Sequence, residues 1–125
     1  MKNANSYDLC VIGCGVAGFA AAMSAVDYGK NVCVVEGDEI GGTGVMWGAL
    51  ASKTMWELSK DYAVASKTDR GFYADQLRVE YQAVRKTVLE AVKEKQTQML
   101  HQIEAYAPSQ WQGPGSITYK RGWGA

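Results

Sequence analysis

The chain has 125 residues, of which 47% are hydrophobic and 21% charged, and its 13 basic residues balance its 13 acidic ones. This composition is that of a globular domain with a sizeable core, and the even charge argues against a nucleic-acid partner, which normally selects a basic excess. No apolar run approaches the roughly 18 residues that cross a bilayer, and the N-terminus lacks the layout of a signal peptide, so we expect no membrane partner and a cytoplasmic location.

The N-terminal part of the chain predicts two strands joined by a helix. Residues 7–12 form one short apolar segment and residues 31–36 another, and both are expected to be buried strands. Residues 19–28 are rich in alanine, and Gly29 is placed to end a helix. The expected packing face of this helix consists of Val16, Phe19, Ala20, Met23 and Val26. Strand, crossover helix and strand make a right-handed unit with parallel strands, which predicts a Rossmann-like α/β fold.

The rest of the chain predicts two helices and a further strand. A glycine-rich loop over residues 37–48 leads to a helix from 49 to about 67, and a second, longer helix runs from about 80 to 105. Its apolar residues keep a helical spacing: Val84, Val88, Val92, Met99 and Ile103. A short polar turn between the two helices predicts an antiparallel hairpin, with Lys86 and Glu90 paired on its surface. After a turn at residues 112–116, residues 117–120 form a candidate strand.

The three cysteines do not indicate a disulfide scaffold, because their number is odd and they form no CxxC pattern. Cys10 and Cys33 lie in the two apolar strand segments and are expected to be small buried hydrophobes. Cys14 has two interpretations: a thiol made reactive by the following helix N-terminus, or a small packing residue. We expect no metal site.

A GxGxxG motif, Gly-Cys-Gly-Val-Ala-Gly, begins at Gly13, after the first strand and before the first helix. Gly13 permits a tight turn, Gly15 leaves room for a pyrophosphate, and Gly18 lets the helix pack closely. The helix N-terminus, with Val16 and Ala17 in its first turn, offers amide groups and partial positive charge to phosphates. The alternative is a glycine-rich turn of a generic α/β protein.

Glu36 closes the second strand, 23 residues after Gly13. An acid at about this distance accepts hydrogen bonds from a ribose hydroxyl in dinucleotide-binding folds, and its charge disfavours the 2′-phosphate of NADP. The alternative interpretation is a solvated acid at the end of a strand. The motif and the acid together predict a dinucleotide site.

A second glycine loop, Gly-Gly-Thr-Gly-Val-Met-Trp-Gly-Ala-Leu-Ala-Ser-Lys, ends at Lys53. Here the sequence resembles the pyridine nucleotide–disulfide oxidoreductases, the family of dihydrolipoamide dehydrogenase and glutathione reductase, most strongly over residues 7–53. In that family Gly-Gly-Thr leads into a cysteine, four residues, a second cysteine, two residues and Ser-Lys. The matching residues are Gly41, Gly42, Thr43, Gly48, Ser52 and Lys53.

The same loop departs from the family pattern at the redox cysteines. Gly44 stands at the first cysteine position and Ala49 at the second, and Ala51 replaces the proline before Ser-Lys. Without the two thiols, electrons cannot pass from a flavin to a disulfide by the family's route. The resemblance implies extra room over the flavin, partly filled by Met46 or Trp47.

By this resemblance the bound dinucleotide is FAD and not NAD. It implies that Gly42 and Thr43 lie near the pyrophosphate, Lys53 beside the isoalloxazine, and Gly115 at the adenine end. His101, the one histidine, is expected to be solvated or to pack on its helix, and the family's catalytic histidine belongs to a C-terminal domain. Trp56 and Tyr62, at helical spacing, are expected in the core.

We therefore expect residues 1–125 to be the N-terminal part of an FAD-binding domain, with residues 1–48 as the nucleotide unit and 49–107 as the helical pair. In the full-length protein, expected to be a homodimer, NAD(P)H would act through other domains. Electrons would pass directly from flavin to an acceptor, without any catalytic residue from this chain. The alternative is a non-catalytic structural or assembly subunit with a flavoprotein-like fold.

Overall fold

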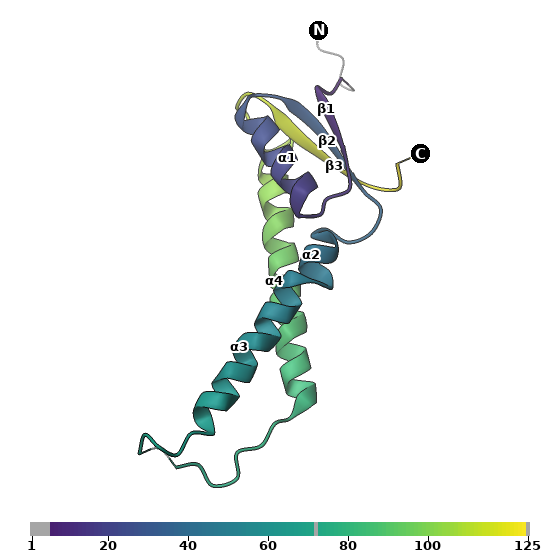
Figure 1. Ribbon diagram of the computed structural model, residues 1–125. Helices are drawn as coiled ribbons and strands as arrows, with labels where there is room; N and C mark the ends of the chain where they lie inside the picture. Colours follow the sequence, from purple (N-terminus) through teal and green to yellow (C-terminus); the bar gives the residue numbers. More distant parts are fainter. Residues whose placement is uncertain (1–5, 72, 125) are drawn as a thin grey trace.

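The computed structural model describes residues 6–71 and 73–124, and it places a small parallel sheet at one end of a long helical hairpin (Figure 1). The elements in chain order are β1 (Leu9–Ile12), α1 (Val16–Asp27), β2 (Asn31–Glu36), α2 (Gly42–Met46), α3 (Ala49–Ala65), α4 (Tyr81–Ala105) and β3 (Ser116–Arg121). The α/β class and the N-terminal βαβ unit are confirmed. The expected loop at residues 37–48 contains a short helix, α2, which its glycines did not indicate.

The sheet has the order β1-β2-β3, and both neighbouring pairs are parallel. Two right-handed crossovers that move in the same direction place their helices on the same face of the sheet. The core cluster on that face joins alternate strand residues to the two helices: Val32, Val34 and Ile117 from the strands, Ala22 and Val26 from α1, and Val92, Met99 and Ile103 from α4. This layer fixes the ends of the three strands relative to the start of α1.

The opposite face of the sheet carries apolar side chains that the described residues do not cover. Ile12 is 75% exposed, and Cys10 is exposed as well. The prediction that the first strand and Cys10 are buried is therefore wrong. The reason is that β1 is an edge strand with helices on one face only, so alternate side chains point away from the core. Cys33 on the central strand is buried, as expected.

The packing face of α1 is confirmed in part. Val26 is buried, and Phe19 and Met23 pack against the core, as expected. Val16, the first residue of the helix, is 60% exposed and Ala20 is also exposed, while Ala22 is fully buried.

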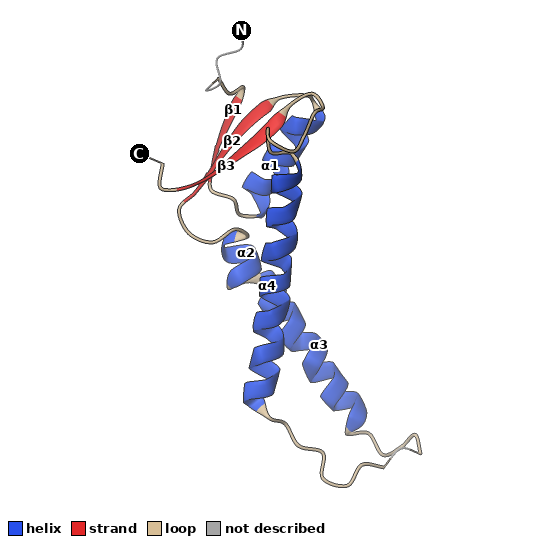
Figure 2. Cartoon of the chain, turned by 180° about the vertical axis from the view of Figure 1, so that it is seen from behind, coloured by secondary structure: helices blue, strands red, loops and turns tan. Residues whose placement is uncertain are grey.

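The hairpin of α3 and α4 extends away from the sheet (Figure 2). The connection spans residues 66–80 and is longer than the predicted short turn. The exposed pair Lys86 and Glu90 is present, with an N–O distance of 3.7 Å. None of the helices within residues 6–71 and 73–124 is long and apolar enough to cross a membrane.

The two helices of the hairpin are covered to different extents. On α4 four of the five predicted apolar residues are buried: Val88, Val92, Met99 and Ile103. On α3, all of which the structure describes, no residue is buried. Trp56 is 65% exposed and Tyr62 44% exposed, so their predicted place in the core is wrong. Tyr62 instead lines a cavity of about 420 Å³ between the helices.

Candidate functional site

The carboxyl ends of the three parallel strands meet at one edge of the sheet, and both glycine loops lie there. The first loop follows β1, and the amide of Gly13 donates to the carbonyl of Val35 in β2 at 2.7 Å. The second loop reaches the first, since the amide of Gly41 donates to the carbonyl of Cys14 at 2.8 Å. Gly15 and Gly41 also form an isolated parallel bridge. The two motifs, separate in sequence, therefore build one surface.

Gly13 and Gly18 are required by the chain's own geometry. Gly13 has a φ of +91°, a conformation that residues with a side chain rarely adopt. A Cβ on Gly18 would overlap the carbonyl oxygen of Gly13 and press on Val11 Cγ1 at 3.1 Å. Gly18 therefore lets the first turn of α1 lie against the loop, as the sequence predicts.

Gly15 is glycine for another reason. Its φ of −71° suits any residue, and a Cβ there would lie 3.8 Å from the Cα of Gly42, an ordinary contact. Nothing in the folded chain requires the missing side chain. The residue lies beside the N-terminus of α1, which no described side chain caps.

Glu36 ends β2 with its carboxylate turned into the loop. One carboxylate oxygen accepts from the amide of Cys14, and the other accepts from the amide of Asp38 at 2.8 Å. The residue is 9% exposed, so it is not the solvated strand-end acid of the alternative interpretation. Each oxygen can accept a further hydrogen bond, so the carboxylate both holds the loop and remains an acceptor for a hydroxyl group.

Cys14 is fully buried between the loop and the core. Burial, and then the negative charge of Glu36, raises the pKa of its thiol to about 11. This shift is opposite to the one that a helix N-terminus alone would cause. Of the two interpretations of Cys14, the structure favours the packing residue.

The second loop, residues 41–53, contains no cysteine. Gly44, within α2, would carry a Cβ 2.9 Å from Cγ2 of Val16, so the start of α1 fills part of the space above it. Ala49 begins α3 and is exposed. Met46 is half-buried, whereas Trp47 is 75% exposed.

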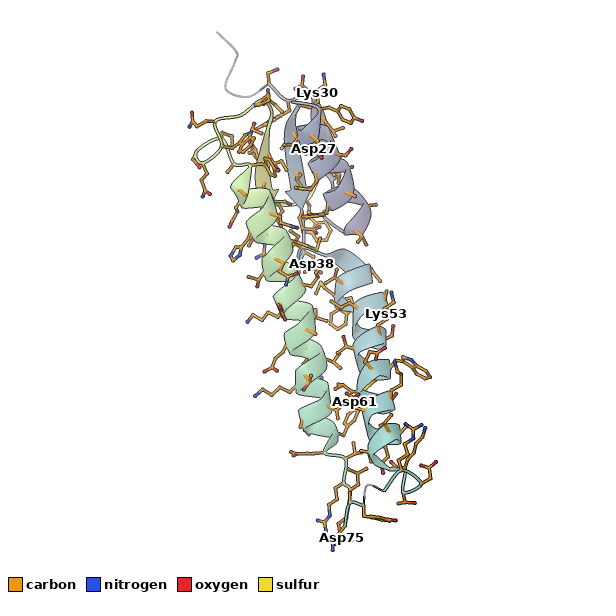
Figure 3. All side chains as sticks on the ribbon, turned by 90° about the vertical axis from the view of Figure 1, so that its left-hand side faces the viewer. Asp27, Lys30, Asp38, Lys53, Asp61 and Asp75 are labelled. Carbon is orange, nitrogen blue, oxygen red and sulfur yellow. The ribbon has the colours of Figure 1, made fainter. Side chains whose placement is uncertain are left out.

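Thr43 and Lys53 are the two polar residues of this loop for which the resemblance implies a role. Thr43 is exposed within α2, and its backbone carbonyl accepts from the amide of Trp47 at 3.0 Å. Lys53 is exposed on the first part of α3, on the side turned away from α4 (Figure 3). Both side chains are therefore exposed in the described residues.

Gly115 does not lie at this edge, which corrects its predicted place. A Cβ on Gly115 would lie 2.8 Å from the backbone of Gly29 and of Lys30, at the amino end of β2. Figure 3 shows Lys30 at the far end of the sheet from Asp38. Gly115 comes before β3, and in a parallel strand that position faces away from the carboxyl edge.

Residues 122–124, Gly-Trp-Gly, occupy the place that was assigned to Gly115. The amide of Gly122 donates to the backbone carbonyl of Glu36 at 2.9 Å. The Trp123 indole lies over Gly37, where an added Cβ would meet the ring at 2.7 Å. Trp123 is 83% exposed. The signal in the sequence was the glycine pair directly after the last strand, since the ends of parallel strands share one edge.

Curated relatives match this chain over less than half of its length. It is 43% identical over 53 residues to the mercuric reductase of Lysinibacillus sphaericus, covering 42% of this chain and 10% of that protein. It is 47% identical over 49 residues to the glutathione reductase of Nostoc sp., covering 39% of this chain and 11% of that protein. The matches thus cover about a tenth of the length of these relatives.

The fold matches a solved structure over nearly the whole chain. The HOCl-induced flavoprotein disulfide reductase RclA from Escherichia coli, solved as a Cu(II) complex, aligns with a TM-score of 0.70 at 19% identity. The alignment covers 95% of this chain and 22% of that one. A family model described as pyridine nucleotide-disulphide oxidoreductase matches residues 7–120. The chain therefore belongs to the pyridine nucleotide-disulphide oxidoreductase family.

Proposed function

We propose that this chain binds FAD at the carboxyl edge of its sheet, as part of an NAD(P)H-linked oxidoreductase that works without a redox disulfide. The observation that carries the proposal is Gly15. Its missing side chain is not explained by the packing or the backbone of the folded chain, and it faces the second glycine loop beside the N-terminus of α1. A group that needs this space and carries negative charge fits there.

The residues present suit FAD. The backbone around Gly15 and Gly42 would receive the pyrophosphate, and the buried carboxylate of Glu36 would accept from a ribose hydroxyl. Trp123 and Gly37 would lie beside the adenine end. Lys53 would place a positive charge near the flavin ring, where a cation stabilises the reduced anionic form.

Bound FAD would supply hydride acceptance and electron transfer, while the chain would bind and orient it. No accessible thiol stands at this site to take electrons from the flavin. The family's two cysteine positions are Gly44 and Ala49, and Cys14 is buried. Electrons would therefore pass from flavin directly to an acceptor. NAD(P)H would act through parts of the protein outside these 125 residues.

Binding of FAD by the 125-residue chain tests this proposal, with Gly15→Ala as the decisive variant. Flavin fluorescence and thermal unfolding would be measured with added FAD, and separately with NAD. At 100 times the Kd, FAD should stabilise the wild type by about 2.7 kcal/mol, and NAD should not. Gly15→Ala should melt like the wild type without FAD but lose the FAD response. A folded wild type without any FAD response, or a Gly15→Ala chain that binds FAD equally well, would overturn the proposal.

A second candidate function is a non-catalytic structural or assembly subunit. The observation that favours it is the loss of both cysteine positions, at Gly44 and Ala49. This candidate predicts a cooperative melting transition that FAD does not move. The thermal measurement above therefore distinguishes the two functions.

A further inference from the structure

Cys10 and Cys33 face each other on the sheet face that the helices leave uncovered. They are direct partners in the parallel register of β1 and β2. Their neighbours in sequence, Val11 and Val34, point into the core on the other face. Side chains of paired residues on neighbouring strands stand side by side, with the strands about 4.8 Å apart. Both thiols are free.

The two thiols differ in their access to solvent. Cys10 is exposed, whereas Cys33 on the central strand is only 6% exposed. Burial, with the neighbouring Cys10 thiol as a second cause, raises the pKa of Cys33. In the described residues a reagent in solution therefore has better access to Cys10 than to Cys33, which lies beside it.

We propose that Cys10 and Cys33 form a reversible disulfide by exchange with a small disulfide such as oxidised glutathione. In this reaction Cys10 is the attacking residue and Cys33 is the resolving residue. The pair is separate from the carboxyl-edge site, and the inference does not depend on FAD binding.

The exchange balances in two steps. The Cys10 thiolate, having lost its proton to solvent, attacks one sulfur of oxidised glutathione, and one glutathione thiolate leaves with the electron pair of the broken S–S bond. Cys33 then loses its proton and attacks the Cys10 sulfur of the mixed disulfide, which releases the second glutathione thiolate. The two thiolates take up the two protons, so the protein loses two electrons and two protons and one oxidised glutathione becomes two reduced ones.

The strand geometry permits this bond and makes it labile. A spacing of about 4.8 Å lies inside the Cα range of disulfides, 4.4–6.8 Å, but the two Cβ atoms must approach to about 3.8 Å. The edge strand β1 has four residues and a single partner strand, so it can shift toward β2. The remaining strain raises the reduction potential, which suits a bond that forms and breaks reversibly.

Alkylation and mass mapping of the folded 125-residue chain test the inference. The chain would be equilibrated with mixtures of reduced and oxidised glutathione, quenched in acid, then unfolded and alkylated. As oxidised glutathione increases, two of the three cysteines should no longer react with the alkylating reagent, and the cross-linked peptides should contain Cys10 and Cys33. Cys14→Ala is the matched control and should give the same cross-link.

The single variants separate the roles of the two thiols. Cys33→Ser should stop at a glutathione adduct on Cys10, and Cys10→Ser should stay unmodified; Cys33→Ala replaces Cys33→Ser if the serine variant is unfolded by circular dichroism. The inference is overturned if the wild type stops at the glutathione adduct, if it stays fully reduced, or if native and urea-unfolded chains give the same mixture of pairings with Cys14.

Discussion

The two glycine loops meet at one edge of the sheet, but they keep different parts of their family's design. The first combines the turn at Gly13, the close packing at Gly18 and the buried acid Glu36. The second keeps its backbone, with φ of +105° at Gly41 and +55° at Gly42, yet it has no thiol at the family's two cysteine positions.

This difference separates backbone from side chains. The first loop relies on backbone amides, glycines and one carboxylate. The family's thiol relay needs two side chains, and the chain folds with Gly44 and Ala49 at those positions. Under the proposed function, two substitutions remove the relay and leave the nucleotide site intact.

The largest effect on the free energy of unfolding is expected at Gly18. Comparing Gly18 with Gly15 separates a glycine that the fold requires from one that the proposed ligand requires. Gly18→Ala should lower the free energy of unfolding by about 4 kcal/mol, because the added methyl overlaps the Gly13 carbonyl. Gly15→Ala, where the nearest atom would be 3.8 Å away, should change it by less than about 1 kcal/mol. Urea denaturation of both variants measures this contrast. Equal losses would show that Gly15 is also structural and would break the comparison.

The buried thiol of the first loop should make stability depend on alkaline pH. The pKa of Cys14 is raised from 9.0 to about 11, so the folded state keeps a proton that the unfolded state loses. The contribution of the Cys14 proton to the free energy of unfolding is complete below pH 9. It is lost as pH rises toward 11, by about 3 kcal/mol at most.

The readout is the difference between wild type and Cys14→Ala, because other groups also titrate in this range. Urea denaturation from pH 7 to 11 should show a steeper loss of stability in the wild type. If the two curves run parallel, Cys14 is not a buried neutral thiol, and the first loop holds a reactive group after all.

The smallest effect concerns the support of the second loop. The side-chain amide of Gln96 on α4 donates to the carbonyl of Ile40 at 3.0 Å. Gln96→Met should cost about 1 kcal/mol of stability, because it leaves that carbonyl without its partner. Gln98→Met, two residues away, removes only an exposed hydrogen bond to Glu94 and should be nearly neutral in the same denaturation assay. Equal effects would show that α4 does not hold the second loop.

Much of the fold and the first loop could be predicted because the signals are local. The limits of β2 agree with the predicted residues 31–36, since a continuous apolar run of valines and one cysteine, bounded by polar residues, marks a buried strand. Gly13 and Gly18 were predicted for the reasons that the structure shows, because turn geometry and helix packing act over a few residues.

The predictions failed where an outcome depends on which partners cover a segment. Cys10 and Trp56 are apolar in type and spacing, but Cys10 lies on a sheet face that the described residues leave uncovered, and Trp56 lies on α3, where no residue is buried. Gly115 was assigned by its Gly-Pro-Gly pattern, whereas strand direction decides which end of β3 lies beside Glu36. A short sequence motif shows neither which residues will cover a segment nor in which direction a strand runs.

The helical hairpin separates β2 from β3 in the sequence, and this separation has a consequence for the order of folding. The pairing of β1 with β2 joins residues such as Leu9 and Val32, 23 apart, whereas β2 and β3 join Asn31 and Ser116, 85 apart. Closing the longer loop through an unstructured chain costs about 1 kcal/mol more in entropy. If α3 and α4 zip together first, the loop shortens before β3 docks. We therefore expect the N-terminal unit and the hairpin to form early and the third strand to join last.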